Sequence, residues 1–279
     1  MGQMLPTRTT TNKGVSLAKS QRTVTVITGG GTGVGAALAR LLSSQGHDVV
    51  IAGRRAEPLE VVAKDTGALV VIGDIATASG AQALISTTID SFGKLDNLVL
   101  NAGIVRNGKV ADLSIEDWNE TVNINLTANF LLSKYALPHL VTSKGNIVGV
   151  SSIASLRSGY GMAAYSASKA ALTSLIQNIA YDYAAEGVRA NVVCPGWILT
   201  EMAEQEFAEA AHTKKTTVEN VFKDLLKFVP QQRASTPDEQ AKPIAWLLSD
   251  EAAYVNGASL VVDGGTTIVD AGMLNLHAN

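Results

Sequence analysis

The stretch TVTVITGGGTGVGAALAR, residues 23–40, decides the fold of this chain. The aliphatic run at 23–28 is typical of a buried strand. Glycines follow at once, and the alanine-rich segment after them, at 34–46, predicts a helix. A glycine turn between a strand and a helix lets the backbone approach a pyrophosphate, and it aims the first N–H groups of the helix at that anion. The stretch therefore predicts a cradle for a dinucleotide.

The same rhythm of aliphatic run, polar turn and amphipathic segment continues along the chain. The runs are nearly continuous rather than alternating, as in a sheet that is covered on both faces. They occupy 23–28, 48–53, 68–74, 95–103, 145–152, 188–196 and 258–265, and helices are predicted between them at 34–46, 80–93, 115–140, 163–187 and 237–249. This alternation predicts an α/β fold, a Rossmann-type doubly wound parallel sheet of about seven strands with helices on both faces.

No linker or internal repeat divides the chain. We expect a polar, flexible tail at 1–20, with a transit peptide as the alternative, and a single Rossmann-fold domain at 21–279. The rhythm breaks at about 201–232, where the sequence is charged and long for a connection. We expect a substrate-loop insertion with short helices there. The apolar face of its part at 218–229 either covers the core or faces the substrate.

The composition excludes several classes of partner. With a net charge of -3 and a pI near 5.8, the chain offers no basic patch for nucleic acid or an anionic membrane. The single cysteine, Cys194, excludes an internal disulfide and suits a small core residue, and the scattered histidines predict no metal. No apolar run approaches the ~20 residues that span a bilayer, and residues 1–20 lack the apolar region that we expect of a signal peptide. We expect a cytoplasmic protein that acts on small molecules.

The end of the second predicted strand indicates which dinucleotide the cradle takes. An acidic residue about 20 positions after the glycines would accept the ribose hydroxyls of NAD. Arg54 and Arg55 stand there instead, and a guanidinium can hold a 2′-phosphate through charge-assisted contacts. This favours NADP(H), with NAD(H) as the alternative. Thr32 in the glycine loop supplies no second basic group.

Tyr165 and Lys169 stand four positions apart in the run YSASK. On a helix, this spacing brings both side chains to one face. A cation beside a phenol favours the phenolate, so we expect Lys169 to lower the pKa of Tyr165 from its usual value near ~10. Tyr165 could then act as a general acid or base near neutral pH. An interfacial tyrosine and a solvated lysine are the alternatives for each residue alone.

Several motifs stand in one order, and together they resemble the short-chain dehydrogenase/reductase family, in its subgroup of single-domain enzymes of this length. The motifs are T-G-x-x-x-G-x-G at 28–35, Asp74 in GDI, NAG at 101–103, Asn125 in NINL, Ser152 in VSS, Y-x-x-x-K at 165–169, PGWILT at 195–200 and DGG at 263–265. The match runs from Thr23 to Gly265. The wider Tyr–Lys spacing of enoyl reductases and the T-G-x-x-G-x-x-G of extended epimerases are both absent.

The resemblance implies four catalytic residues, Asn125, Ser152, Tyr165 and Lys169. Tyr165 would exchange a proton with the substrate oxygen, Ser152 would donate to that oxygen, and Lys169 would also bind the nicotinamide ribose. Asn125 would distort its helix and hold a water in a proton relay, whereas Asn123 would be a surface or cap residue. The implied cofactor-binding residues are Thr28, Gly29, Gly31, Thr32, Gly33, Val34, Gly35, Arg54, Arg55, Asp74, Ile75, Asn101, Ala102, Gly103, Tyr165, Lys169, Pro195, Gly196, Ile198 and Thr200.

These residues predict an NADP(H)-dependent oxidoreductase, a carbonyl reductase, that interconverts a ketone or aldehyde and an alcohol. An NAD-dependent alcohol or dihydrodiol dehydrogenase and a non-catalytic dinucleotide-binding protein are the alternatives. The expected substrate wall comprises Ile104, Val105, Ala154, Leu156, Tyr160, Trp197 and Met202. This wall is mostly apolar and has no arginine or lysine to fix a carboxylate, which favours a small uncharged substrate. The resemblance also implies a homotetramer, or a homodimer, with 115–140 and 163–187 at a subunit contact.

Overall fold

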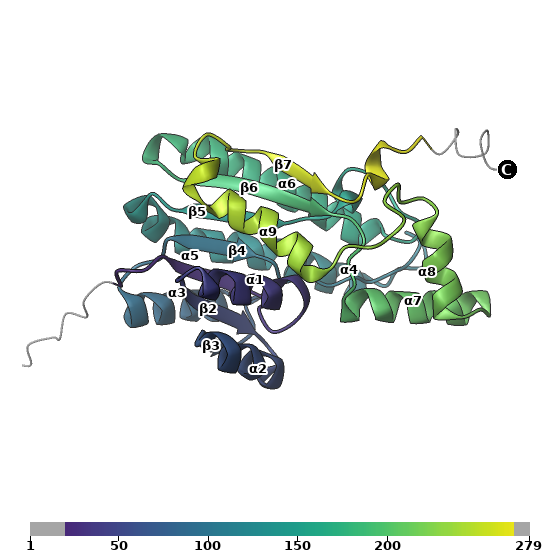
Figure 1. Ribbon diagram of the computed structural model, residues 1–279, viewed down its shortest axis with the longest axis horizontal. Helices are drawn as coiled ribbons and strands as arrows, with labels where there is room; N and C mark the ends of the chain where they lie inside the picture. The colour runs from purple at the N-terminus through teal and green to yellow at the C-terminus, as the bar shows by residue number, and fades with distance from the viewer. Residues whose placement is uncertain (1–19, 271–279) are drawn as a thin grey trace, which may run out of the picture.

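The computed structural model describes residues 20–270, so the predicted tail lies almost wholly outside the described residues. A seven-stranded sheet runs through this part of the chain in the order β3-β2-β1-β4-β5-β6-β7. All neighbouring strands are parallel. The strands are β1 (Val24–Thr28), β2 (Asp48–Gly53), β3 (Leu69–Ile72), β4 (Asn97–Leu100), β5 (Asn146–Val150), β6 (Arg189–Pro195) and β7 (Ser259–Val262), and each falls within a predicted run (Figure 1).

Helices fill the connections between the strands. They are α1 (Gly33–Ser44), α2 (Ala56–Thr66), α3 (Ala78–Phe92), α4 (Ile115–Val122), α5 (Ala128–Ser143), α6 (Ala163–Asp182), α7 (Glu201–Lys214), α8 (Val218–Leu226) and α9 (Pro237–Leu248). The shorter helical segments are η1 (Asn123–Thr127), η2 (Ile153–Ser155), η3 (Ala184–Glu186), η4 (Asp250–Ala252) and η5 (Thr266–Ile268). The predicted helix at 115–140 is therefore divided, because the π-helix η1 separates α4 from α5.

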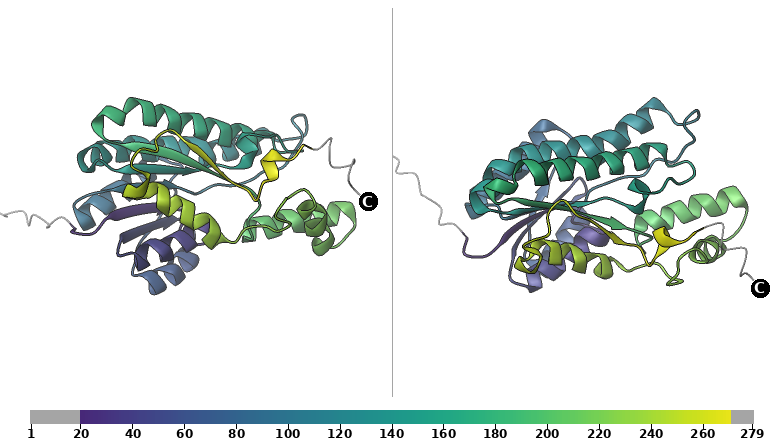
Figure 2. Two further views of the ribbon diagram at one scale, coloured as in Figure 1. Left: turned by 45° about the horizontal axis from the view of Figure 1, so that its top comes forward. Right: turned by 90° about the horizontal axis from the view of Figure 1, so that it is seen from above.

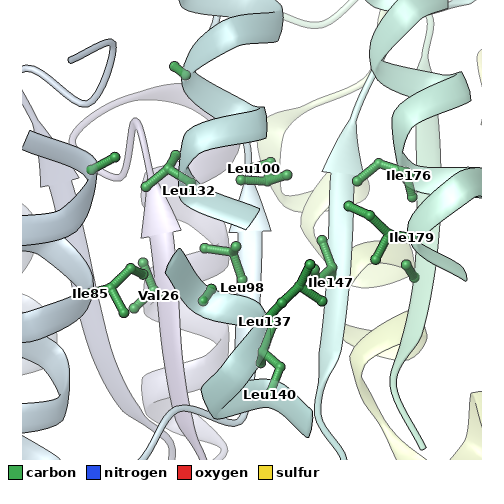
Figure 3. Close-up of a cluster of buried hydrophobic side chains, with 14 of the residues drawn as sticks. Val26, Ile85, Leu98, Leu100, Leu132, Leu137, Leu140, Ile147, Ile176 and Ile179 are labelled. Atoms are coloured by element: carbon green, nitrogen blue, oxygen red, sulfur yellow. The ribbon is translucent and has the colours of Figure 1, made fainter. Parts of the chain in front are cut away.

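Two layers of helices cover the sheet, with α3, α5 and α6 on one face and α1, α2 and α9 on the other (Figure 2). Successive strand residues enter opposite layers: Val26 of β1 packs in the first and Ile27 in the second, and both are fully buried. In the first layer, Leu98 and Leu100 of β4 lie beside Leu132 of α5 (Figure 3). Coverage of both faces explains the continuous apolar runs and confirms the predicted doubly wound sheet.

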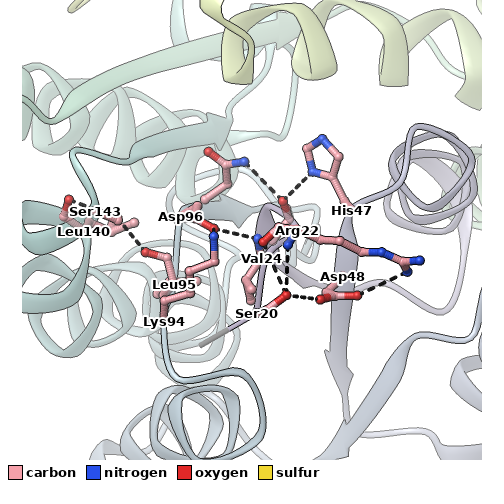
Figure 4. A network of polar contacts seen from close by, with 12 residues as sticks. Ser20, Arg22, Val24, His47, Asp48, Lys94, Leu95, Asp96, Leu140 and Ser143 are labelled. Carbon is pink, nitrogen blue, oxygen red and sulfur yellow. Dashed lines mark hydrogen bonds and ion pairs between the residues drawn. The ribbon is translucent and has the colours of Figure 1, made fainter. Parts of the chain in front are cut away.

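Polar contacts join the starts of β1, β2 and β4 at one edge of the sheet (Figure 4). The Asp96 carboxylate accepts a hydrogen bond from the Val24 N–H at 2.7 Å and pairs with Lys94 at 2.9 Å. The Asp48 carboxylate accepts a hydrogen bond from the Ser20 hydroxyl. These contacts occupy the polar groups at the amino ends of the strands, whereas ligands of such sheets bind at the carboxyl ends.

The predicted insertion at 201–232 forms α7 and α8, which project beyond the carboxyl edge of the sheet (Figure 1, Figure 2). Phe207 of α7 packs against both Trp197 and Phe222, with ring centroids 5.4 Å apart in each pair. The apolar face at 218–229 thus packs on α7, and no residue of it lines the cavity described below. Of the two interpretations of this face, the one in which it covers a core is the one observed.

Candidate active site

A cavity of about 920 Å³ lies at the carboxyl ends of the strands, where the strand order reverses between β1 and β4. Open α/β sheets bind ligands in this crevice because helix N-termini and loops converge there. The cavity extends from the glycine loop after β1 to Tyr165 on α6. Every residue predicted to bind the dinucleotide lines it except Thr28 and Gly35, and every predicted catalytic residue lines it except Asn125.

The glycine loop fits a pyrophosphate because side chains are excluded from it. Gly33 has φ = 50°, in the left-handed region that favours glycine. A Cβ on Gly35 would collide with the carbonyl oxygen of Gly29, so the loop and α1 touch directly. Thr32 makes no side-chain cap on α1, and the first turn holds no acidic residue. The N–H groups of this turn are therefore available to an anion.

Thr28 and Asn101 tie the glycine loop to the loop after β4. The Thr28 hydroxyl accepts hydrogen bonds from the N–H groups of Asn101 at 3.0 Å and Ala102 at 3.1 Å. The Asn101 amide donates to the carbonyl oxygens of Thr28 at 2.9 Å and Gly29 at 3.3 Å. Thr28 therefore positions the cavity wall from behind, while Asn101 both supports and lines it.

Arg54 and Arg55 line the cavity at the end of β2, and both are exposed. Arg55 lies 3.5 Å from the carboxylate of Glu201, whereas Arg54 pairs with no carboxylate of residues 20–270. Asp74, after β3, accepts a hydrogen bond from the Ala76 N–H at 3.0 Å. A phosphate at this end of the cavity would meet Arg54 directly and would compete with Glu201 for Arg55.

Ser151 and Ser152 follow β5 and meet different partners. The buried Ser151 hydroxyl donates to the carbonyl oxygen of Lys169 at 3.0 Å and contacts the Thr173 hydroxyl at 3.0 Å. Ser152 Oγ instead accepts a hydrogen bond from the Ala154 N–H at 3.1 Å, and the Ser152 hydroxyl lies close enough to the Tyr165 phenol to offset part of the rise that burial causes in the pKa of Tyr165. The two serines thus face different neighbours, as successive residues of an extended backbone do, and Ser152, the serine that the resemblance implies, is the one near Tyr165.

Tyr165 and Lys169 share one face of α6, with the Lys169 ammonium 5.7 Å from the Tyr165 ring centroid. Burial is the largest cause of the pKa shift of both groups. It raises the pKa of Tyr165 to about 12, with a smaller increase from the charge of Glu206. It lowers the pKa of Lys169 to about 8. In each case the charged form is penalised because it loses water.

The expected lowering of the pKa of Tyr165 by Lys169 is therefore not observed. The Lys169 ammonium donates a hydrogen bond to the carbonyl oxygen of Val150 at 2.8 Å. Loss of water around the phenol outweighs any help that this ammonium gives to the phenolate, so the pKa rises instead. Tyr165 is consequently protonated at neutral pH, the state in which a phenol can donate its proton.

Asn125 lies in η1, where the local helical distortion expected at this residue occurs. Its side chain is fully buried. The amide donates to the Ile104 carbonyl oxygen at 2.9 Å and the Ser168 hydroxyl at 3.1 Å, and Oδ1 accepts from the Ile104 N–H at 2.8 Å. The side chain thereby fixes the loop after β4 to α6. Asn123 is exposed, as a surface residue would be.

Gly103 lets Lys169 and Asn125 approach the same point of the backbone. A Cβ on Gly103 would lie 3.2 Å from the Lys169 ammonium nitrogen and 3.3 Å from Oδ1 of Asn125. Because buried groups pack closely, one of the two side chains would have to move to admit that Cβ. The NAG motif therefore sets the position of Lys169 as well as the shape of the strand end.

One face of α7 lines the cavity with polar side chains, which the sequence analysis did not predict. Ala203 and Phe207 pack into the small core shared with α8. Gln205, Glu206 and Glu209 line the cavity. Burial and the charge of Glu209 raise the pKa of Glu206 to about 7. The spacing of the apolar residues along α7 could have indicated this polar face, because it leaves the glutamates on another side of the helix.

The expected substrate wall is only partly present. Four residues of the expected wall line the cavity: Ile104, Val105, Ala154 and Trp197. Leu156 and Tyr160 are exposed and do not line it. The Met202 side chain lies outside the described structure. Arg106 and Arg157 also line the cavity, because the loops after β4 and β5 both extend along it, and this corrects the expectation of no basic residue. Arg106 is paired with Glu120 at 2.9 Å and Asp117 at 3.5 Å.

Three further features of residues 20–270 bear on the site. No helix within this range is long and apolar enough to cross a membrane. No group of histidine, cysteine, aspartate and glutamate side chains in the same range could hold a metal ion. Cys194 is buried, with Sγ 3.8 Å from the Ser155 hydroxyl, as expected of a core residue.

Known proteins resemble this chain over most of its length. A family model described as Enoyl-(Acyl carrier protein) reductase matches residues 29–267. Protein MoaE of Klebsiella aerogenes is 36% identical over 249 residues, which cover 88% of this chain and 96% of MoaE. Meso-2,3-butanediol dehydrogenase of Serratia marcescens is 34% identical over 250 residues, which cover 88% and 95%. The ligand-free aldohexose dehydrogenase (AldT) of Thermoplasma acidophilum superposes with a TM-score of 0.83 at 29% identity, covering 90% of this chain and 96% of AldT.

The chain belongs to the short-chain dehydrogenase/reductase family, as its motifs predict. It is an oxidoreductase that acts on CH–OH groups with NAD(P)⁺ as the acceptor. The alternative of a non-catalytic dinucleotide-binding protein is thereby set aside.

Proposed function

We propose that the protein is an NADP(H)-dependent carbonyl reductase that interconverts a ketone or aldehyde and an alcohol by hydride transfer, with Tyr165 as the general acid or base. One observation carries the proposal: Ser152, Tyr165 and Lys169 meet in the same cavity that the glycine loop at 29–33 lines. A dinucleotide held along that loop would extend toward Tyr165, where the substrate oxygen would lie.

The reaction needs a hydride, a proton and donors for the substrate oxygen. A bound nicotinamide dinucleotide would supply or accept the hydride. In reduction, negative charge develops on the carbonyl oxygen, and the hydroxyls of Ser152 and Tyr165 are donors for it. Tyr165 then gives its proton to that oxygen, and in oxidation it takes the proton back from the alcohol. A pKa of about 12 keeps the phenol protonated for the donating step.

Lys169 and Asn125 support this chemistry in different ways. With a pKa lowered to about 8, Lys169 is still a cation at neutral pH, where it can stabilise the tyrosinate and bind the nicotinamide ribose. Asn125 acts as a positioning residue, since its side chain makes its hydrogen bonds to Ile104 and Ser168. Its Oδ1 accepts one hydrogen bond and keeps a second acceptor position, which the water of the expected proton relay from Lys169 would use.

The preference for NADP(H) rests on Arg54 and Arg55. Arg54 has no competing carboxylate among the described side chains, so it can pair with a 2′-phosphate. The partial neutralisation of Arg55 by Glu201 favours the alternative, an NAD-dependent alcohol or dihydrodiol dehydrogenase. The ratio of kcat/KM for NADPH and NADH tests the choice. A preference for NADH would overturn the NADP(H) proposal and leave the oxidoreductase assignment standing.

We expect a small uncharged carbonyl or alcohol substrate, because Ile104, Ala154 and Trp197 give part of the cavity an apolar lining. A panel of ketones and alcohols followed by NADPH absorbance tests this expectation. Activity confined to charged members would contradict it.

A homotetramer, or a homodimer, in the cytoplasm completes the proposal. Trp118 of α4 is 42% exposed and Phe130 of α5 is 49% exposed, and a subunit contact through α4, α5 and α6 would cover such apolar side chains. Light scattering on the purified protein tests the assembly, and a monomer would contradict it.

A further inference from the structure

We propose that Glu206 is a specificity-determining residue that binds a second hydroxyl group of the substrate, so that the preferred substrate is a polyol or a hydroxylated carbonyl compound. The inference rests on the proposed function, because it concerns the alcohol or carbonyl compound on which Tyr165 acts. It goes beyond that function by naming the polar group that the substrate must carry.

The first support is the position of Glu206. It lies on α7, is half-buried, and lines the cavity that contains Tyr165. Its charge is close enough to contribute to the raised pKa of Tyr165. A substrate whose reacting oxygen meets Tyr165 would therefore share the cavity with this carboxyl group.

The second support is that Glu206 is left without a protein partner. No hydrogen bond or ion pair joins its carboxyl group to another described residue, whereas Glu201 pairs with Arg55 and Glu239 with Arg233. A half-buried carboxylate is destabilised by the loss of its water unless a hydrogen-bond donor replaces that water. Above its pKa of about 7, the Glu206 carboxylate can only accept hydrogen bonds, so the compensating ligand group must donate.

The third support concerns which donor fits. Arg157 lines the same cavity, and its guanidinium donates to the carbonyl oxygens of Leu156 at 3.3 Å and Thr267 at 3.4 Å. A guanidinium only donates and an ionised carboxylate only accepts, but a hydroxyl does both. Arg157 repels a cation and attracts an anion, whereas Glu206 and Glu209 do the reverse, so a ligand of either charge meets a repulsive group in this cavity. A neutral, hydroxylated substrate can both donate a hydrogen bond to Glu206 and accept one from Arg157.

The test uses matched alcohols that differ in one substituent. One set is 2-propanol, 1,2-propanediol and 1-amino-2-propanol, and a bulkier set is cyclohexanol, 1,2-cyclohexanediol and 2-aminocyclohexanol. Each is oxidised by wild type, Glu206→Ala and Glu206→Gln with both NADP⁺ and NAD⁺. Glu204→Gln is the control, because it removes a charge from an exposed position of α7 that does not line the cavity. Circular dichroism verifies that each variant is folded.

We expect wild type to favour the diol over the mono-alcohol by about tenfold or more in kcat/KM, as a hydrogen bond to a charged group implies. Glu206→Ala abolishes that preference mainly through KM, Glu206→Gln keeps part of it through its carbonyl oxygen, and Glu204→Gln keeps all of it. The mono-alcohol loses less than the diol in Glu206→Ala and Glu206→Gln, and it keeps its wild-type kcat/KM in Glu204→Gln.

Three results would overturn the inference. They are a wild type that oxidises no diol of either set faster than its mono-alcohol, an equal loss on both alcohols in Glu206→Ala, and a preference for the amino alcohol. Mono-alcohol turnover that Tyr165→Phe abolishes would leave the proposed function intact while the inference fails. Mono-alcohol turnover that persists in Tyr165→Phe would instead refute the proposed role of Tyr165.

Discussion

The ammonium nitrogen of Lys169 lies 5.7 Å from the ring centroid of Tyr165, one helical turn away on α6. Burial shifts the two groups in the directions that favour their neutral forms, with a pKa of about 12 for Tyr165 and about 8 for Lys169. Lys169 therefore remains a cation at neutral pH while Tyr165 keeps its proton. A phenolate formed when Tyr165 gives that proton away would have Lys169 as the cation beside it.

Loss of the Lys169 charge should impair turnover. Lys169→Met removes the cation beside the phenol, and we expect kcat/KM to fall by about 100-fold or more. Lys169→Arg should not rescue activity, because Gly103 and Asn125 already border the ammonium closely. Steady-state kinetics measure the loss, and fluorescence titration with NADPH measures the expected weaker binding. Near wild-type turnover in the methionine variant would contradict the role of Lys169.

Gly103→Ala should reduce turnover without any change to a catalytic group. The new methyl group would press on the Lys169 ammonium and on Asn125. We expect a loss of about 1–3 kcal/mol in unfolding free energy, as overpacking usually causes, and a tenfold or greater loss of kcat. Gly73→Ala is the control, because no atom lies within 4 Å of its added Cβ. The idea fails if both variants behave alike.

Glu201→Gln should strengthen the use of NADPH. The substitution removes the carboxylate that lies 3.5 Å from Arg55 and leaves that guanidinium to a 2′-phosphate. Exposed ion pairs contribute at most about 1 kcal/mol, so we expect kcat/KM for NADPH to rise by about twofold to fivefold. The value for NADH should not change, and added salt should weaken the effect. Glu204→Gln controls for the change in net charge; an equal gain with NADH would count against the pairing.

Glu206 should make the folding stability depend on pH. Its pKa is raised from 4.5 to about 7, so the folded state binds more protons than the unfolded state between these values. The stabilising contribution is fully present below pH 4.5 and is lost as the pH rises through about 7. The free energy of unfolding of Glu206→Gln, compared with that of wild type, should therefore rise between low pH and pH 8. We expect this rise to be about 1–2 kcal/mol after allowance for solvent screening. Urea unfolding measures this difference, and a constant difference across the pH range would contradict it.

The fold was predictable from the pattern of apolar residues along the sequence. Val26 and Ile27 are both apolar because opposite layers of helices bury them, and a run of such residues predicts a central parallel strand. The interruption of the helix predicted at 115–140 is different, because η1 depends on the hydrogen bonds of Asn125 to Ile104 and Ser168. Helical periodicity alone does not reveal contacts of this kind.

The site was predictable where chemistry follows a motif and less so where it depends on loop paths. Tyr165 and Lys169 meet because a helix fixes their spacing. Arg157 and Glu206 reach the cavity through the loop after β5 and through α7, and no local pattern indicates where that loop and that helix lie relative to the sheet. The raised pKa of Tyr165 likewise depends on the surrounding protein, since burial outweighs the neighbouring cation.

The exchange of a proton between Tyr165 and the substrate oxygen is the central claim, and Tyr165→Phe tests it most directly because it removes one hydroxyl group. Turnover of the best ketone and the dissociation constant of NADPH are measured on the same preparation. We predict that kcat falls by about 1000-fold while the dissociation constant stays within about threefold of wild type. Turnover of the phenylalanine variant within about tenfold of wild type would contradict the claim.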